Sequence, residues 1–117
     1  DDYDTPDVTG LRDYIHVSDL AAAHRLALGW LDKGGASGAM NCGYGHGFSV
    51  LEVIESVKRV TGVDFTVKME SRRAGDSPKV VAKVDRIQER LNWQAAYDDL
   101  DTIVAHAYAW EKALDSI

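Results

Sequence analysis

Side chains suited to a phosphorylated ligand occur at two places in this sequence of 117 residues. Arg12 and Tyr14 stand two residues apart in a stretch with strand propensity, so both side chains should project from the same face. Arg73 and Asp76 belong to the run Arg-Arg-Ala-Gly-Asp at 72–76, where glycine lets the backbone approach a ligand closely. Arginine offers a planar fork of donors to a diphosphate, tyrosine adds a hydroxyl on a rigid ring, and aspartate accepts from ribose hydroxyls. These four residues are therefore candidates for binding a phosphorylated nucleoside.

Each of these groups also has an ordinary structural interpretation. On composition alone, the run at 72–76 favours a solvated charged turn. Arg12 could pair with Asp13 or another nearby acid, and Tyr14 could pack in the core. The sequence shows no histidine, cysteine and acid cluster with the spacing of a metal site. Histidines in apolar stretches are more often hydrogen-bonded core residues than ligands, and we expect this of His16, His24 and His106.

A glycine loop occupies residues 43–47, between a predicted strand and a predicted helix. That context suits anion capture at a helix amino terminus. The pattern G-x-G-x-G nevertheless differs from the spacing of a dinucleotide-binding fingerprint. We therefore predict a turn in the first place, with His46 exposed on it.

Four helices are predicted from apolar periodicity and from end signals. The clearest start is the capping box Ser49-Val50-Leu51-Glu52, whose helix should end at Gly62. Ser18 and Asp19 are the N-cap candidates of the first helix. The helices are expected at about 19–32, from Ser49 to Gly62, from Asp85 (as cap) to Leu91, and from Asp98 or Asp99 to Leu114. The apolar faces of the first and last should be Leu20, His24, Ala27, Leu28 and Leu31, and Leu100, Ile103, Ala107, Trp110 and Leu114.

Short strands should lie between these helices. Alternation and β-branched residues predict strands at about 11–16, after the turn at Gly10, and at 39–42, 63–69 and 80–82, with a polar loop at 70–79. The expected fold class is therefore α/β, a small mixed arrangement of about four helices and three or four short strands. The sequence shows no internal repeat, so one unit over 1–117 is expected.

Composition excludes several classes of function. The net charge of −6 argues against sequence-independent binding of nucleic acid and against anionic membranes. No apolar run approaches the roughly 20 residues that cross a membrane. The single cysteine, Cys42, cannot form an internal disulfide, which favours a reducing, cytoplasmic setting.

Four stretches of the chain carry a family resemblance. They are TPDVTGLRDYIHVSDLAAAH (5–24), NCGYGHGFSVLEVIE (41–55), RRAGD (72–76) and LNW (91–93). Together they closely resemble the UDP-glucose 4-epimerases of the extended short-chain dehydrogenase/reductase family. The resemblance covers nearly the whole chain and corresponds to roughly the last third of such a subunit. The chain is therefore expected to be a carboxyl-terminal, substrate-binding portion without the NAD-binding Rossmann domain.

The resemblance implies an activity and a role for each site residue. Such an enzyme interconverts UDP-glucose and UDP-galactose through a 4-keto intermediate, using bound NAD, and the intact enzyme is expected to be a homodimer. Arg12 and Tyr14 would contact the phosphates of the UDP-sugar, Arg73 the diphosphate and Asp76 the ribose, with Val50 near the nucleotide. The catalytic serine, tyrosine and lysine and the NAD loop lie outside the matching stretches, so the chain alone should be inert.

Two positions depart from the family pattern. Val8 stands where glycine is usual, and because a β-branched residue disfavours positive φ, the loop should follow a different path. Ala74 replaces a proline, which loosens the loop before Gly75. Tyr108 and Lys112 have the four-residue spacing of the superfamily's catalytic pair, but they lie far past its position and are expected to be non-catalytic.

Two other functions remain open. Another NAD-dependent nucleotide-sugar epimerase, dehydratase or decarboxylase of the same superfamily would share these motifs. A non-catalytic binding module that kept the superfamily's shape is the alternative from a different class.

Overall fold

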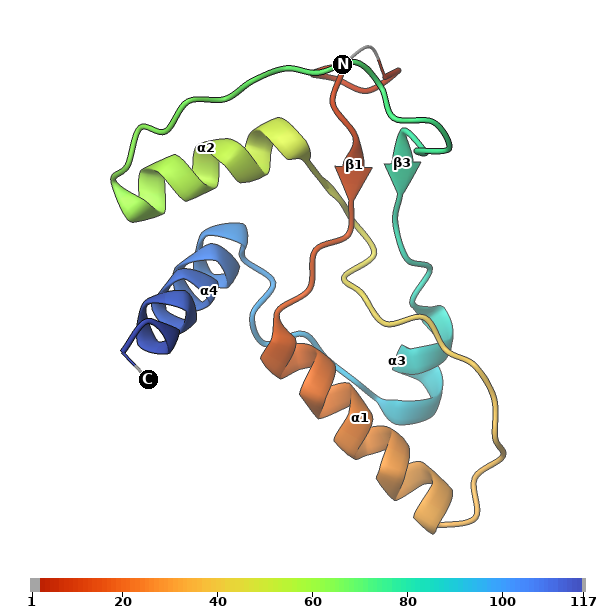
Figure 1. Ribbon diagram of the computed structural model, residues 1–117. Helices are drawn as coiled ribbons and strands as arrows, with labels where there is room; N and C mark the ends of the chain where they lie inside the picture. Colours follow the sequence, from red (N-terminus) through yellow and green to blue (C-terminus); the bar gives the residue numbers. More distant parts are fainter. Residues whose placement is uncertain (1–2, 117) are drawn as a thin grey trace.

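The computed structural model describes residues 3–116 and has the predicted α/β fold. Four helices and a short mixed sheet of three strands occur in this described part (Figure 1). In chain order the elements are β1 (Leu11–Arg12), α1 (Val17–Asp32), β2 (Phe48–Ser49), α2 (Val50–Thr61), β3 (Lys79–Val80), α3 (Asp85–Leu91) and α4 (Leu100–Leu114).

β1 lies at the centre of the sheet, whose order is β2-β1-β3. It pairs antiparallel with β2, with Leu11 opposite Ser49, and parallel with β3, with Arg12 opposite Val80. Each strand is only two residues long, so few backbone groups are satisfied by the sheet and the rest need other partners. The sheet places Arg12 beside both the start of α2 and the end of the loop before β3.

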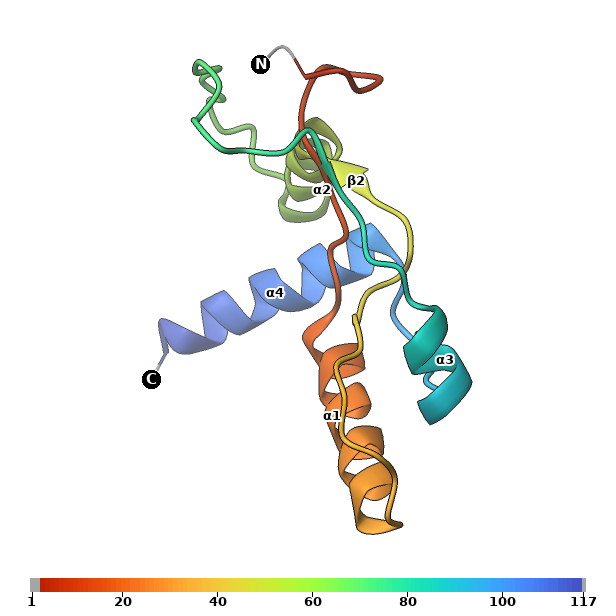
Figure 2. The ribbon, with the colours of Figure 1, turned by 90° about the vertical axis from the view of Figure 1, so that its right-hand side faces the viewer.

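The helices form two pairs (Figure 1). α2 packs on α4, and α1 packs on α3. Between α2 and α4, Asp101 accepts hydrogen bonds from Ser56 Oγ at 2.5 Å and from Arg59 Nη2 at 2.6 Å. Figure 2 shows α4 running away from the other elements toward the carboxyl terminus. The radius of gyration, 16.9 Å, exceeds the roughly 13 Å of a compact domain of this length, so the chain does not close around one large core.

The core of the described residues is small and lies between α1 and α3. Its fully buried members are Ala23, Val84, Ile87, Leu91 and Trp93. α1 turns Ala23 toward α3, so the apolar face predicted for α1 is only partly correct. Leu28 is 70% exposed, His24 and Leu31 are also exposed, and on α4 Trp110 is 60% exposed.

Most helix ends follow their predicted signals. Ser49 Oγ accepts from the Glu52 amide at 3.1 Å while the Ser49 amide donates to Glu52 Oε1 at 3.0 Å, which confirms the capping box. Gly62 ends α2 with φ of +71°. Asp99 rather than Asp98 caps α4, and Asn92 ends α3 in the left-handed region.

Two predicted caps are wrong. α1 begins at Val17, and its N-cap is His16, whose Nδ1 accepts from the Ser18 amide at 2.9 Å. The buried side chain of Asp19 accepts hydrogen bonds from other donors, so it does not serve as the cap. The N-cap of α3 is Val84, without a side-chain hydrogen bond, because Asp85 already lies inside the helix.

Several predicted strands are shorter or missing. The strand expected at 11–16 is reduced to β1, and the one at 80–82 appears as β3 at 79–80. The segments 39–42 and 63–69 form no strand, because neither has a neighbouring strand among residues 3–116 to pair with. β2 was not predicted, since its two residues belong to the start signal of α2.

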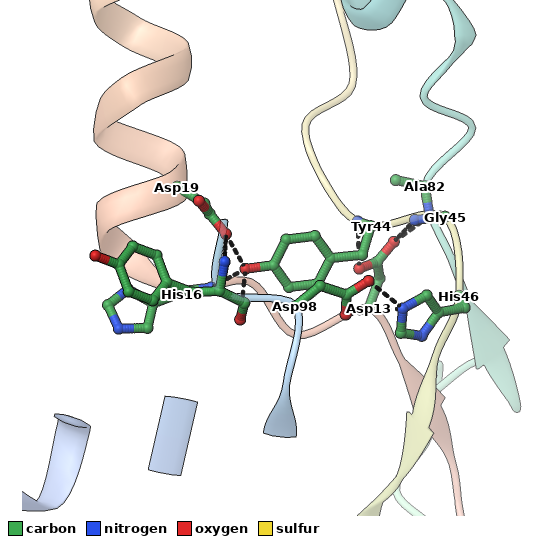
Figure 3. A network of polar contacts seen from close by, with 9 residues as sticks. Asp13, His16, Asp19, Tyr44, Gly45, His46, Ala82 and Asp98 are labelled. Carbon is green, nitrogen blue, oxygen red and sulfur yellow. Dashed lines mark hydrogen bonds and ion pairs between the residues drawn. The ribbon is translucent and has the colours of Figure 1, made fainter. Parts of the chain in front are cut away.

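A buried carboxylate joins α1 to two distant segments. Asp19 is 2% exposed and accepts a hydrogen bond from the Tyr44 hydroxyl at 2.5 Å (Figure 3). It also accepts from the amides of Ala96 and Tyr97, both at 2.9 Å. Its backbone oxygen accepts from Trp93 Nε1 at 2.9 Å. Burial by itself raises the pKa of Asp19, but the hydrogen bonds from Tyr44 and the two amides outweigh it and the pKa lies below its usual value.

A second carboxylate organises the glycine loop. Asp13 accepts from the amides of Tyr44, Gly45 and Ala82 at 2.9, 3.0 and 3.2 Å (Figure 3). A Cβ at Gly43 would lie only 2.7 Å from Asp13 Oδ2, so the close approach requires glycine there. The loop is thus the predicted turn, and its amides are held by the chain's own anion.

Val8 adopts a φ of +59°, although a β-branched residue disfavours positive φ. The turn is imposed by its neighbours. The Val8 amide donates to the Thr5 oxygen at 3.1 Å and the Tyr3 amide to the Val8 oxygen at 3.2 Å. Asp7 Oδ1 accepts from the Thr9 hydroxyl at 2.6 Å, and Asp7 also accepts from Ser49 Oγ at 2.5 Å. The loop therefore holds Val8 in the left-handed region, at the cost of backbone strain.

We expect Asp19→Asn to lower the free energy of unfolding by about 2–4 kcal/mol, because an amide NH₂ would replace an acceptor that faces several donors. Asp32→Asn, on the exposed end of the same helix, should change it by less than about 0.5 kcal/mol. Urea titrations of the two variants would measure the difference, and equal effects would contradict the role given to Asp19.

The contribution of Asp19 to stability should also depend on pH. The folded pKa of Asp19 is lowered, so its contribution is complete above the unfolded value of about 3.9 and is lost as pH falls through the lower folded value. The unfolding free energy of the native sequence should therefore fall below about pH 4 more steeply than that of Asp19→Asn. Parallel pH profiles for the two proteins would argue against this assignment.

Val8→Gly should raise the free energy of unfolding by about 1 kcal/mol, because glycine adopts positive φ without the steric penalty of a β-branched residue. The matched control is Val63→Gly, another exposed valine, whose φ is not positive. That change should destabilise the chain slightly, through the entropy of the unfolded state. Thermal unfolding monitored by circular dichroism would compare the two, and a lower midpoint for Val8→Gly would refute the strain.

Candidate functional site

One cavity of about 370 Å³ brings together all five residues that were predicted to contact a ligand. They come from three separate parts of the chain. Its lining consists of Tyr3, Gly10, Arg12, Tyr14, Val50, Ile54, Val67, Lys68, Met69, Glu70, Ser71, Arg73 and Asp76.

The elements that hold these side chains follow from local sequence signals. Arg12 is the second residue of β1, and Tyr14 follows two residues later along the same extended segment. Val50 is the first residue of α2, fixed by the capping box at Ser49. Gly75, with φ of +80°, turns the 72–76 loop so that both of its functional residues line the same cavity.

The charged groups of the cavity contact one another directly. Asp76 Oδ2 accepts from Arg73 Nη2 at 2.8 Å and from Arg73 Nε at 3.0 Å. Asp76 Oδ1 lies 3.6 Å from Arg12 Nη2. The hydrogen bond from Arg73, with the positive charges of both arginines, holds the pKa of Asp76 below its usual value. Two guanidinium groups from residues 61 positions apart in sequence therefore meet at one carboxylate.

Tyr14 brings a neutral hydroxyl to this charged group. Burial raises the pKa of its phenol, and the charge of Arg12 opposes that shift only in part. The phenol is therefore protonated at neutral pH and can donate a hydrogen bond to an anion. Arg12 does not pair with Asp13, whose oxygens are occupied by backbone amides.

The two adjacent arginines of the 72–76 loop have different surroundings. Arg73 lines the cavity, whereas the Arg72 guanidinium lies 4.3 Å from the centre of the Tyr3 ring. Tyr3 is itself buried. The Arg72–Tyr3 contact is a cation–π interaction that fastens the loop to the start of the described chain.

Sequence reasoning missed one wall of the cavity. Residues 67–71 line it, but they were predicted to be the end of a strand and the start of a loop. Among them Lys68 adds a third cation, paired with Glu70 at 3.4 Å. The sequence did carry a signal for this wall. Lys68 stands between two apolar residues, Val67 and Met69, and so marks a polar edge on an otherwise apolar stretch.

The histidines outside the cavity have structural partners. His16 is buried, stacks on Tyr97 with ring centres 4.5 Å apart, and has its Nε2 2.7 Å from His106 Nδ1. It is thus the hydrogen-bonded core residue that was predicted. His24 is exposed rather than in the core, because it lies on the outer side of α1. His46 is exposed as predicted, 2.8 Å from Asp98 on the facing segment (Figure 3).

In residues 3–116 no group of three or more metal-ligating side chains is present. Within that range, too, every helix is too short or too polar to span a membrane. The Lys112 ammonium lies 4.6 Å from the centre of the Tyr108 ring on α4, a contact that any helix allows at this spacing.

Comparison with known proteins confirms the resemblance carried by the motifs. No family model matches the chain. It is 54% identical over 114 residues to a UDP-glucose 4-epimerase of Azospirillum brasilense and 46% identical over 112 residues to one of Lacticaseibacillus casei. These alignments cover 97% and 96% of this chain but 33% and 34% of the relatives, so the chain spans about a third of their length.

Solved structures agree with the sequence comparison. The UDP-Glc/GlcNAc 4-epimerase of Campylobacter jejuni matches 97% of this chain and 34% of its own, with 50% identity and a TM-score of 0.88. A UDP-glucose-4-epimerase of Stenotrophomonas maltophila, solved with NAD and formylated UDP-arabinopyranose, matches 99% of this chain and 34% of its own, with 40% identity and a TM-score of 0.92. Over nearly its whole length, this chain is therefore similar in sequence and fold to the carboxyl-terminal portion of UDP-glucose 4-epimerases.

Proposed function

We propose that this chain is the UDP-sugar-binding portion of a UDP-glucose 4-epimerase. The observation that carries the proposal is the cavity in which Arg12 and Arg73 share Asp76. Two guanidinium groups that converge from distant segments offer a bidentate site for a diphosphate. The similarity to epimerases over nearly the whole chain supports a UDP-sugar as the source of that diphosphate.

Each side chain has a defined task in this proposal. Arg12 and Arg73 hold the diphosphate, and the protonated phenol of Tyr14 donates to one of its oxygens. Asp76 accepts from the ribose hydroxyls, for which a carboxylate is well suited. Val50 supplies apolar contact at the first turn of α2. Binding energy gathered here would anchor the nucleotide while the sugar, further along, changes its orientation.

NAD is proposed to be held outside this chain. The glycine loop at 43–47 does not fit a dinucleotide, because the amides of Tyr44 and Gly45 are already bonded to Asp13. In the proposed enzyme NAD, held elsewhere, would supply hydride transfer at C4 of the sugar. The residues of this chain would contribute only the fixed position of the nucleotide.

The surface of the chain supports a larger assembly. Exposed Leu28 and Leu31 on α1 and Trp110 on α4 leave apolar area uncovered, and the segment 39–42 lacks a pairing partner within residues 3–116. We propose that the rest of the epimerase covers these surfaces. The intact enzyme is proposed to act as a cytoplasmic homodimer in galactose metabolism, and the free thiol of Cys42 is compatible with a reducing compartment.

Arg73→Ala and Arg12→Ala are each expected to weaken UDP binding by roughly tenfold or more, because each removes charge-assisted hydrogen bonds to the diphosphate. Arg25→Ala removes an exposed cation of α1 that lies outside the cavity, and it should leave the affinity within about twofold. Isothermal titration calorimetry with UDP would measure all three. A native chain that binds no UDP, or a loss in Arg25→Ala equal to that in the cavity variants, would contradict the proposed site.

The chain alone is expected to bind UDP without epimerising UDP-galactose, because the described residues offer only binding groups in the cavity. The measurement is the formation of UDP-glucose from UDP-galactose with NAD added to the purified chain. Turnover above the rate of a blank without protein would show that catalytic groups exist within these 117 residues.

A further inference from the structure

Both acceptor positions on Asp76 Oδ2 are already in use in this structure. A carboxylate offers about four lone-pair positions on its two oxygens. Arg73 occupies two of them on Oδ2, through Nη2 at 2.8 Å and Nε at 3.0 Å. Arg12 faces Oδ1 at 3.6 Å, and a hydrogen bond from the Tyr3 side chain also favours the charged carboxylate. A ribose hydroxyl can therefore reach Oδ2 only if one of the present donors leaves.

The exposure of the three charged side chains shows which of them is free to move. The Arg73 side chain is 83% exposed, whereas Arg12 and Asp76 are 30% and 27% exposed. Arg12 is further fixed by a hydrogen bond from its Nη1 to the Leu11 oxygen at 2.7 Å. The long, exposed Arg73 side chain is thus the group that can turn away from Asp76 at little cost in packing.

We propose that Asp76 holds Arg73 in place of the ligand's diphosphate, and that the two groups exchange partners when a nucleoside diphosphate binds. Arg73 leaves Oδ2 for the phosphate oxygens, and Oδ2 becomes free to accept from the ribose hydroxyls. This inference rests on the proposed function and adds to it a coupling between the two halves of the ligand. Phosphate binding releases the acceptor that the ribose needs, so each half favours the other.

The variant Asp76→Asn distinguishes binding of the diphosphate from binding of the ribose. Without the ion pair, Arg73 has no partner to give up, so inorganic pyrophosphate should bind about two- to fivefold more tightly than to the native chain. UDP should bind about fivefold or more weakly, because its ribose loses a charged acceptor. Opposite changes for the two ligands are the signature of the exchange. Calorimetric titrations of the full chain with each ligand would give the affinities, and circular dichroism would confirm that the variant is folded.

Asp4→Asn is the matched control for charge. Asp4 is exposed next to Tyr3 in sequence, but it does not line the cavity. Its replacement changes the net charge by the same amount as Asp76→Asn. The affinity for pyrophosphate should therefore change by less than about twofold if the exchange, rather than net charge, determines the effect.

The possible failures can be told apart. If Asp76→Asn binds pyrophosphate no more tightly than the native chain, while the native chain still binds UDP, the exchange is wrong and the proposed function stands. If Asp4→Asn gives the same gain as Asp76→Asn, the effect is one of net charge and the exchange is again wrong. If the native chain binds neither UDP nor pyrophosphate, both the proposed function and the exchange are overturned.

Discussion

Carboxylates that accept hydrogen bonds from backbone amides hold this structure together. The strands are two residues long, so a sheet cannot satisfy the amides of the long connecting segments. Asp13 and Asp19 take over that task, each accepting from three donors. A buried carboxylate is costly unless it is fully hydrogen-bonded, and here the donors are available only if the distant segments arrive in the right place. The same bonds that offset the cost of burial therefore fix the arrangement of the chain.

The candidate site depends on the same constraint. Asp13 stands next to Arg12 in sequence and would be its obvious partner, but its oxygens are committed to the glycine loop and to Ala82. Arg12 is left to project into the cavity, where it faces Asp76. Because Asp13 accepts from backbone amides, the guanidinium of Arg12 remains available to another anion.

Features whose cause lies within a few residues could be predicted from the sequence. The capping box at Ser49, the glycine end of α2 at Gly62 and the cap at Asp99 depend on groups three or four positions away, and all three are present. The site residues were found through motifs, and the structure places them around one cavity. A motif specifies both the residue types and their spacing, whereas composition specifies the residue types alone.

Features that depend on distant partners could not be predicted. Strands were expected at 39–42 and 63–69 from local propensity, but a strand needs a neighbour, and residues 3–116 offer none. Asp19 was expected to cap a helix because such residues usually do, whereas the amides that claim it lie 77 and 78 positions later. The residues near Asp19 in sequence give no sign that distant amides will bind its carboxylate.

The regular placement of three acids has a consequence for how this chain can vary. Asp7, Asp13 and Asp19 follow one another at intervals of six, and each is pinned to a different distant segment. The stretch between them contains the turn at Val8, β1 and the start of α1. A single inserted or deleted residue would pull at least one carboxylate from its donors and disturb the placement of Arg12 and Tyr14 at the cavity. This stretch should consequently tolerate exchanges of side chains while keeping its length constant across homologous proteins.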